Sequence, residues 1–579
     1  MSAEPGDRIE TRRSAAAAAL VVLAAVVGLG LMVDSIGRSS ATYDETLYLE
    51  TAAWWWRTGA QESISRAGSP LSFWKIQQIP VLWLLDQTGR GSWIDDPKGH
   101  EPELLTWARL GGLWIWVAAL LTTALWSLRL HGRAAMVLAA WWFALSPNLL
   151  AHGALATMEL PATAASMGSA FLFWRHLATG RRRAFIASGL LAGVAFSCKF
   201  TAVLWPILYL ATWVLDRRPW GFRALLRTTA RAMILGAAFV ALMIVGDLLV
   251  TGFATVPASR QVGRHPSIEA RFSPALARVI SAAAEMPIPQ DFVGFFRQFQ
   301  HQRSGGLGYL LGERGIGGWR HYYLVAMAVK IPLLFWVVLV ARLAANRRIE
   351  AARPSATPII IAVLYLAAAS VGSSRNFGFR YLLPVAPLAI VWISGLAQAG
   401  RLGRTIALVG LVGQALAVAS SHPYELTYFN ELASGRTGGR KILADSNLDW
   451  GQGLKGLVDL QRNDPRLRDL TLYYFGDTDP RVYGVAGSAH VVHAERTDAD
   501  FPLVLQAPTA YLAVSASLEW GPWGPPGFFH ELAALEPIAM TADSTIAVYR
   551  SSDLAALRAR GEGPSGARSE PRNRGVPRQ

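Results

Sequence analysis

The chain has little cysteine and little charge for its length. Of its 579 residues only Cys198 is a cysteine, so no disulfide can form within the chain. Charged residues make up 16% of the sequence, whereas a soluble protein carries about 25%. These shortages exclude a disulfide framework and argue against a soluble globular protein. We expect Cys198 itself to be a small buried thiol.

Hydrophobic residues make up 52% of the sequence and gather in long apolar stretches. These stretches cover residues 14–33, 105–128, 134–151, 160–177, 184–198, 200–215, 232–250, 322–341, 357–371, 379–396 and 404–420. Inside a bilayer each segment must satisfy its own backbone hydrogen bonds, which a helix does. The pattern predicts a mainly α, polytopic helical membrane protein with about 11 transmembrane helices. The two stretches that meet near Cys198 can also form one re-entrant pair.

The net charge of +15 is concentrated between alternate apolar stretches. These basic clusters are Arg8, Arg12 and Arg13; Arg129 and Arg133; Arg175 and Arg181 to Arg183; Arg217, Arg218, Arg223, Arg227 and Arg231; Arg342, Arg347, Arg348 and Arg353; Arg401 and Arg404. Cytoplasmic loops carry such an excess of arginine and lysine. The pattern predicts a multi-pass plasma-membrane protein with a cytoplasmic N-terminus and an extracytoplasmic C-terminal region. The charge suits anionic lipid headgroups and indicates no nucleic-acid partner.

The composition divides the chain into four parts. They are a cytoplasmic N-terminus (1–13), a transmembrane domain (14–420) with outer loops 34–104 and 251–320, an extracytoplasmic domain (421–551) and a disordered tail (552–579). The first outer loop is rich in tryptophan, which suits helices lying in the membrane interface. The second is basic although it faces outward, so its arginines are candidates for contact with phosphate.

The C-terminal region has the pattern of a small α/β domain. Short β-like runs occur at Thr471–Phe475, Tyr511–Ser515 and Thr545–Tyr549, after a helical stretch at Leu454–Arg462. From Ser552 onward Arg, Gly, Pro and Ser predominate, which predicts disorder.

Polar residues occur at four outer membrane ends, where they are costly unless functional or wet. They are Asp44 with Glu45, His152 through Glu159, Lys199, and Arg375 through Arg380. Structural explanations stand beside the functional one: the carboxylates can cap helices, and the cations can extend to the interface as anchors. Because the predicted topology puts all four on one side, we interpret them as one constellation.

At these residues the sequence resembles a known family. The pair after the first apolar stretch, together with "LSPNLLAHGALATMELPA", "GVAFSCKFTAV" and "FGFRYLLPVAP", resembles motifs of GT-C fold membrane glycosyltransferases, specifically the protein O-mannosyltransferase-like group (glycosyltransferase family 39). "HPYELTYFNELASG" followed by "DSNLDWGQGLKGL" is similar to bacterial members. The resemblance spans roughly residues 40–455. Family members often have Asp where this chain has Glu159.

The resemblance implies an inverting transfer of a hexose, mannose-like or related, from a polyprenyl phosphate to an acceptor hydroxyl on the outer face. The acceptor stays open between protein (O-glycosylation), a lipid and a cell-envelope glycan. Asp44 is the expected base, with Glu45 and Glu159 as the other catalytic carboxylates. A lipid phosphate leaves as an anion and needs cationic stabilisation. The candidates for donor-phosphate binding are Lys199, Arg380, Arg375 and Lys75.

Further polar residues are candidates for acceptor or sugar contacts. They are His152, Asp445, Asn447, Asp449, Trp450 and Gln452, and a structural turn explains those of the C-terminal region equally well. No cofactor is certain, and a divalent metal between Asp44, Glu45 and Glu159 stays open. A transporter or flippase of a lipid-linked saccharide is the alternative function, although no repeat symmetry is evident. A non-catalytic scaffold would leave the acidic loop unexplained.

Overall fold

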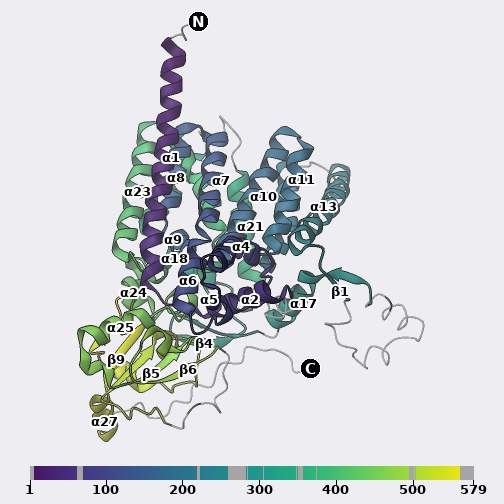
Figure 1. Cartoon of the computed structure of the whole chain (residues 1–579). Coiled ribbons are helices and arrows are strands. Elements are labelled where there is room, and N and C mark those ends of the chain that lie inside the picture. The colour runs from purple at the N-terminus through teal and green to yellow at the C-terminus, as the bar shows by residue number, and fades with distance from the viewer. Residues whose placement is uncertain are drawn as a thin grey trace.

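The computed structural model describes residues 5–60, 69–217, 222–257, 282, 285–303, 305–346, 349, 356–372, 374–494, 501 and 504–560. Helices run side by side in a bundle, and a β-sheet domain lies at one end of it (Figure 1). The predicted class, a mainly α polytopic membrane protein with a C-terminal α/β domain, is confirmed. Arg260, Arg264 and Arg271 of the second outer loop lie outside the described residues.

The bundle is built from apolar helices of different lengths. They are α1 (Pro5–Arg38), α7 (Leu113–His131), α8 (Arg133–Ala144), α10 (Glu159–Thr179), α11 (Arg182–Phe196), α12 (Trp205–Arg217), α13 (Phe222–Thr251), α18 (Tyr322–Lys330), α19 (Leu333–Ala344), α21 (Thr357–Gly372), α22 (Val385–Ile393) and α23 (Gly400–Ser421). Among the described residues, four helices are long and apolar enough to cross a membrane alone, or up to six if two bent pairs count as spans. Several of the predicted stretches are thus shorter or broken helices.

Two of the breaks lie at the membrane end that faces the β-sheet domain. The chain bends by 62° between α8 and α9 (Pro147–Gly153), and by 107° between α18 and α19. The short 3-10 helices η1 (Phe200–Leu204) and η2 (Phe379–Leu382) precede α12 and α22. Because such breaks leave polar backbone and side chains at membrane depth, they are tolerated where protein or water satisfies them.

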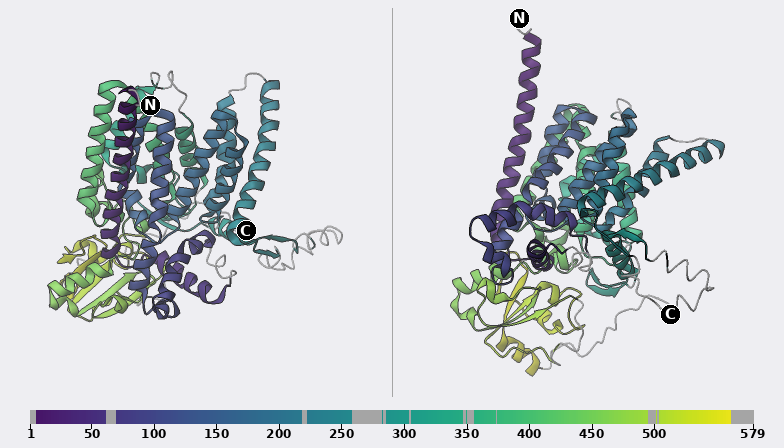
Figure 2. Two further views of the ribbon diagram at one scale, coloured as in Figure 1. Left: turned by 45° about the horizontal axis from the view of Figure 1, so that its top comes forward. Right: turned by 45° about the vertical axis from the view of Figure 1, so that its right-hand side comes forward.

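A layer of short helices lies beside the β-sheet domain, at the same end of the bundle (Figure 2). It contains α2 (Tyr43–Thr58), α4 (Ser72–Gln87), α5 (Gly91–Asp95), α6 (Glu101–Leu110) and α17 (Gln290–Arg303). Its apolar core includes Tyr48, Trp74 and Leu105, with Trp55 and Trp56 packed against it. Two antiparallel strand pairs, β1 (Thr255–Pro257) with β2 (Pro287–Pro289) and β3 (Leu307–Leu310) with β4 (Glu313–Ile316), belong to the second outer loop.

The C-terminal domain contains a five-stranded mixed sheet in the order β6-β5-β7-β9-β8. Its strands are β5 (Leu470–Phe475), β6 (Ser488–Val492), β7 (Tyr511–Ser515), β8 (Ala539–Met540) and β9 (Ile546–Arg550). β5 pairs in parallel with β6 and β7, whereas β9 is antiparallel to β7 and β8. The amphipathic helix α25 (Leu454–Asn463) packs its buried leucines on this sheet. Three strands and α25 were predictable as apolar runs; the edge strands β6 and β8 were missed because they are short or exposed.

Short helices connect these elements. They are α24 (Gly435–Gly439), α26 (Ala516–Glu519), η3 (Ser394–Gln398), η4 (Glu425–Thr427), η5 (Glu431–Ala433), η6 (Asp445–Asn447), η7 (Pro465–Arg468), η8 (Pro480–Tyr483) and η10 (His530–Ala534).

The prediction of a disordered tail from Ser552 is wrong for its first residues. They form α27 (Ser551–Ala559), whose Leu554 is buried in the core of the sheet domain. The side chain of Arg558 donates a hydrogen bond to Glu531 and another to the Leu505 carbonyl. One buried leucine and one ion pair thus hold a segment whose composition predicts disorder. The rest of the predicted tail, 561–579, lies outside the described residues.

Candidate active site

Two carboxylates and two cations form a continuous chain of ion pairs between the bundle and the α/β domain. Nη1 of Arg380 lies 2.7 Å from Oδ2 of Asp44 and 3.2 Å from Oε1 of Glu159. Nζ of Lys199 lies 3.0 Å from the same Glu159 oxygen. The four residues come from segments up to 336 positions apart. The structure thus brings together four of the predicted site residues, which we call the charged cluster.

Helix ends and breaks position the members of the charged cluster. Asp44 lies in the first turn of α2, and Glu159 is the first residue of α10. Carboxylates at these places are favoured by the positive end of the helix dipole. Lys199 lies in the extended linker between α11 and η1, and Arg380 lies in η2. The interruptions that shorten the predicted membrane stretches therefore carry the two cations.

The charged cluster is largely buried. The side chains of Glu159 and Arg380 are only 4% and 9% exposed, whereas that of Asp44 is 24% exposed. Glu159, Lys199 and Arg380 line a cavity of about 280 Å³ together with residues of α10, η1 and α21. Within the described residues, Oε2 of Glu159 and Nε of Arg380 have no hydrogen-bond partner. The cluster thus combines an accessible carboxylate with cations that face a cavity.

Glu45 has a different environment from its neighbour. Its carboxylate forms two hydrogen bonds with Arg109, at 2.8 and 2.7 Å, and both side chains are fully buried. It also accepts hydrogen bonds from the backbone N–H groups of Thr42 and Ala156 and completes a capping box at the start of α2. Burial raises the pKa of Glu45, but the Arg109 charge and these hydrogen bonds together hold it below its usual value. The geometry of Glu45 therefore fits the structural explanation, in which this carboxylate caps a helix.

A loop of the C-terminal domain contacts Arg380 directly. The guanidinium carbon lies 4.2 Å from the centre of the Trp450 ring, within cation–π range. Oδ1 of Asn447 accepts a hydrogen bond of 2.9 Å from the backbone N–H of Phe379, the residue before Arg380. Lys330 donates to the Asn447 carbonyl at 2.7 Å and so ties this loop to α18. Trp450 thus lies against the cation and Asn447 bonds to the backbone beside it, and their predicted role as acceptor or sugar contacts stays a prediction.

The other candidates in this loop mainly hold its own fold. Asp449 accepts hydrogen bonds from the backbone N–H groups of Gly451 and Ser517, and burial raises its pKa to about 7. Gln452 bonds to the backbone of Leu448 and Trp450. These are turn contacts, as the structural explanation predicts.

Asp445 combines a strained backbone with a buried carboxylate. Its φ of 58° lies in the left-handed region, which is uncommon for a residue other than glycine. Its carboxylate accepts a hydrogen bond from the Trp523 indole at 3.1 Å. Burial raises the pKa of Asp445, against the charge of Arg380. Strain at such a residue is common where the surrounding structure fixes a functional site.

The remaining candidates are His152, Arg375 and Lys75. His152 is buried in α9, and its Nδ1 has no hydrogen-bond partner among the described residues. Arg375 donates to the His301 carbonyl of α17 at 3.1 Å. Lys75 lies over the Trp55 ring, and burial lowers its pKa to about 8 against the charge of Asp291. The contacts of Arg375 and Lys75 are thus with the outer helical layer.

Three residues that contact the candidate residues were missed in the sequence. Tyr48 lies one helical turn after Asp44 and directs its hydroxyl toward Oδ2 at 3.4 Å, a spacing that the sequence displays. Arg109, the partner of Glu45, lies within an apolar stretch, where a charge is a signal in itself. Lys330 carries the same signal at the bend between α18 and α19.

No metal ligand set is recognisable in the described part of the chain: no group of three or more His, Cys, Asp or Glu side chains is arranged to hold an ion.

The structure has matches among solved structures, whereas no protein-family model and no curated protein matches the sequence. ArnT from Cupriavidus metallidurans bound to undecaprenyl phosphate matches at 15% identity and a TM-score of 0.44, over 92% of this chain and 98% of its own. Its apo state matches with the same identity and coverage at a TM-score of 0.39. The Archaeoglobus fulgidus oligosaccharyltransferase, in complex with Zn and sulfate, matches at 11% identity and a TM-score of 0.41, over 86% of this chain and 68% of its own. At these identities the matches assign no substrate or residue role to this chain.

Fold and site together define the class. The protein is a polytopic helical membrane protein with an α/β domain at one end of its bundle, and a buried charged cluster lies where the two meet.

Proposed function

We propose that this chain is a GT-C fold membrane glycosyltransferase that moves a sugar from a polyprenyl-phosphate donor to an acceptor hydroxyl. The observation that carries the proposal is the contact of one guanidinium, that of Arg380, with both Asp44 and Glu159. A transfer of this kind needs a carboxylate for the acceptor proton and cations for the leaving phosphate, side by side. The charged cluster has both.

Asp44 is the proposed general base. It is the most exposed carboxylate of the cluster, so an acceptor hydroxyl can approach it. Its Oδ2 takes the proton as the acceptor oxygen attacks the anomeric carbon, and the bond to the phosphate oxygen breaks on the opposite face. The anomeric configuration is inverted in such a single displacement. Tyr48 orients the same carboxylate oxygen.

Arg380 and Lys199 bind the donor phosphate. Both line the cavity beside Glu159, and both are charged donors of the kind that suits a phosphate. A phosphate that bonds to Arg380 competes with Asp44 for Nη1. Donor binding thereby loosens the Arg380–Asp44 pair and frees Oδ2 for the acceptor proton.

Glu159 holds the two cations in place. Its Oε1 contacts both Arg380 and Lys199, which would otherwise repel each other. Oε2 stays available for a sugar hydroxyl, since it has no hydrogen-bond partner within the described residues. An aspartate at this position would be one methylene shorter and would reach less far toward the cations.

The proposed site faces the outer side of the plasma membrane. The support for this orientation is the alternation of basic clusters along the sequence. Arg481 in the C-terminal domain is 80% exposed, so Arg481→Cys in a Cys198→Ser background gives a single accessible thiol. An impermeant maleimide should label it on intact cells; labelling only after permeabilisation would reverse the orientation.

The function is tested by incubating purified protein with polyprenyl-phosphate sugars and candidate acceptors. Mass spectrometry of the product identifies sugar and acceptor, of which a mannose-like hexose and a protein hydroxyl are the first to try. Movement of donor lipid across a vesicle membrane without any transfer would instead support the flippase alternative.

A further inference from the structure

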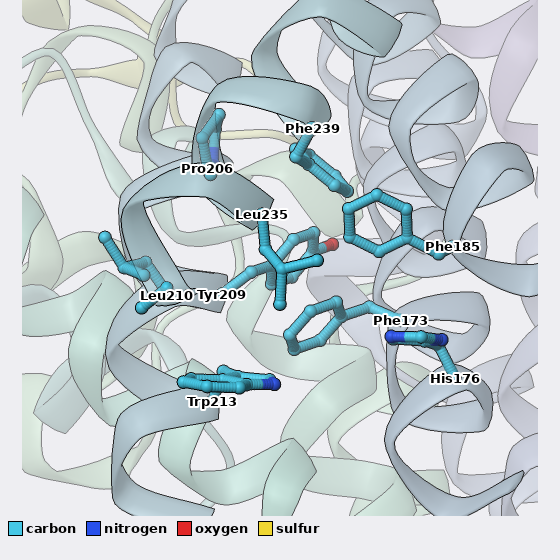
Figure 3. Close-up of a pocket in the computed structure, with 11 residues that line it drawn as sticks. Phe173, His176, Phe185, Pro206, Tyr209, Leu210, Trp213, Leu235 and Phe239 are labelled. Atoms are coloured by element: carbon cyan, nitrogen blue, oxygen red, sulfur yellow. The ribbon is translucent and has the colours of Figure 1, made fainter. Parts of the chain in front are cut away.

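A second cavity, here called the aromatic cavity, lies between α10, α11, α12 and α13 (Figure 3). About 340 Å³ of space, part of it open to the outside of the protein, lies between its walls, and Phe173, Phe185, Tyr209, Trp213, Leu235 and Phe239 are among the residues that line it. The Phe173 and Tyr209 rings stack at 4.3 Å, and Phe239 meets Tyr209 edge-on at 5.3 Å. A cavity with this lining accepts hydrocarbon and little else.

The aromatic cavity lies at the lipid-facing edge of the bundle. α13 forms one wall, and its neighbouring side chains point outward, with Met233 and Ile234 exposed by 66% and 71%. Only 22% of the apolar window of this helix is buried. In the membrane these side chains contact acyl chains, so a lipid chain can reach the cavity from the bilayer.

Gly236 leaves room in the wall of the aromatic cavity. A Cβ built on this glycine meets no other atom within 4 Å. A larger side chain here therefore extends into open space without a clash at its Cβ. This position offers a way to fill the cavity and leave its wall in place.

A basic rim lies beside the aromatic cavity, at the bundle end away from the α/β domain. His176 lines the cavity, and its Nδ1 lies 3.2 Å from the Arg181 carbonyl. Arg181, Arg182 and Arg183 follow at the start of α11, all exposed. No described residue forms a salt bridge with them. Exposed arginines at a membrane surface attract anionic headgroups.

We propose that the aromatic cavity binds one acyl chain of an anionic glycerophospholipid whose phosphate lies among Arg181, Arg182 and Arg183. Apolar walls and a basic rim match the two ends of such a lipid. The lipid then covers an edge of the bundle at which α13 has few neighbours, and it stabilises the packing of α13 on α11 and α12.

The phosphate of the proposed sugar donor belongs to a different place. It is assigned to the charged cluster, at the start of α10, whereas His176 lies in the last turn of that helix. His176 follows Glu159 by 17 positions along the helix, which is roughly 25 Å. The lipid site is therefore independent of the proposed glycosyl transfer.

The test is thermal unfolding of the purified full-length protein in detergent, titrated with dioleoyl phosphatidylglycerol or dioleoyl phosphatidylcholine. The two lipids share their acyl chains and differ in headgroup charge. We expect phosphatidylglycerol to raise the apparent Tm at a far lower concentration than phosphatidylcholine. Replacing Arg181, Arg182 and Arg183 together with glutamine should weaken the phosphatidylglycerol response by roughly a hundredfold, because each such charge is worth about 1 kcal/mol.

Gly236→Leu should abolish the response to both lipids. Gly30→Leu in α1 is the matched control, because a Cβ at Gly30 also meets no atom within 4 Å; its response should stay unchanged. Equal potency of the two lipids, or a normal response of Gly236→Leu, would overturn the proposal. Loss of the phosphatidylglycerol effect on adding sugar-free polyprenyl phosphate would assign the cavity to the donor's tail instead. If Gly236→Leu does not fold, the arginine variant, which changes only exposed side chains, decides the question.

Discussion

The guanidinium carbon of Arg380 lies 4.2 Å from the centre of the Trp450 ring, so a residue of the α/β domain covers a cation of the membrane bundle. Trp450 is 2% exposed and is one of the largest fully buried side chains. Phe377, three residues before Arg380, stacks on Trp523 of the same domain at 6.4 Å. The α/β domain therefore contributes to the position of Arg380, together with the two carboxylates.

Trp450→Leu should raise the KM for the donor by roughly tenfold, because a buried cation–π contact is worth about 1–2 kcal/mol. Trp450→Phe keeps an aromatic face and should stay within about threefold of wild type. Steady-state kinetics at varied donor concentration measures both variants. Equal losses in Leu and Phe variants, with a fall in Tm, would indicate a packing role alone.

Arg380→Ala should lower kcat/KM for the donor by about 10²–10³, the usual cost of removing one group that stabilises developing charge. Arg375→Ala is the matched control. Arg375 lies in the same segment as Arg380, but its Nε donates a hydrogen bond to the His301 carbonyl. Its removal should change kcat/KM by less than about threefold. A larger effect of Arg375→Ala than of Arg380→Ala would move the phosphate site toward α17.

Glu45→Gln should act on stability rather than on chemistry. It leaves Arg109 buried without its charged partner, which costs roughly 3–5 kcal/mol. The Tm and the yield of purified protein should both fall, while the folded protein keeps most of its transfer activity. An inactive Glu45→Gln protein with wild-type Tm would give Glu45 a catalytic role.

The raised pKa of Asp449 predicts that the stability of the protein depends on pH. Its pKa of about 7 in the folded protein exceeds that of an exposed aspartate, about 3.9, so the folded state binds more protons between these values. Its contribution to stability is therefore present at low pH and is lost as the pH rises through about 7. Between pH 5 and 8 the apparent Tm should fall more steeply in wild type than in Asp449→Asn. Identical slopes would contradict this.

The sequence predicted the charged cluster better than its surroundings. Asp44, Glu159, Lys199 and Arg380 follow from two signals readable without a structure: polarity at the ends of apolar stretches, and alternation of arginines that puts them on one side. Arg375 carries the same signals, and Lys75 lies in an outer loop on the same predicted side, but both contact the outer helical layer, because the direction of a side chain depends on the rotation of its segment. No local pattern in the sequence gives that rotation.

Long-range partners were the least predictable part. Glu45 and Arg109 are 64 residues apart, and Trp450 is 70 residues beyond Arg380; each pair forms only when separate elements pack. The strands of the α/β domain were readable where they are buried apolar runs, as in β5, and unreadable where they are short, as in β8. The helix at the start of the predicted tail is held by one buried leucine, Leu554, whose burial cannot be inferred from amino-acid composition.

The most direct test of the account is Asp44→Asn, assayed by transfer of labelled sugar from a polyprenyl-phosphate donor by purified protein. The amide keeps the shape of the side chain but cannot take the acceptor proton, so kcat should fall by about 10²–10⁴. Expression and Tm should stay close to wild type, because Asp44 is partly exposed and lies in the first turn of α2. A variant that folds normally and transfers sugar at the wild-type rate would contradict the account.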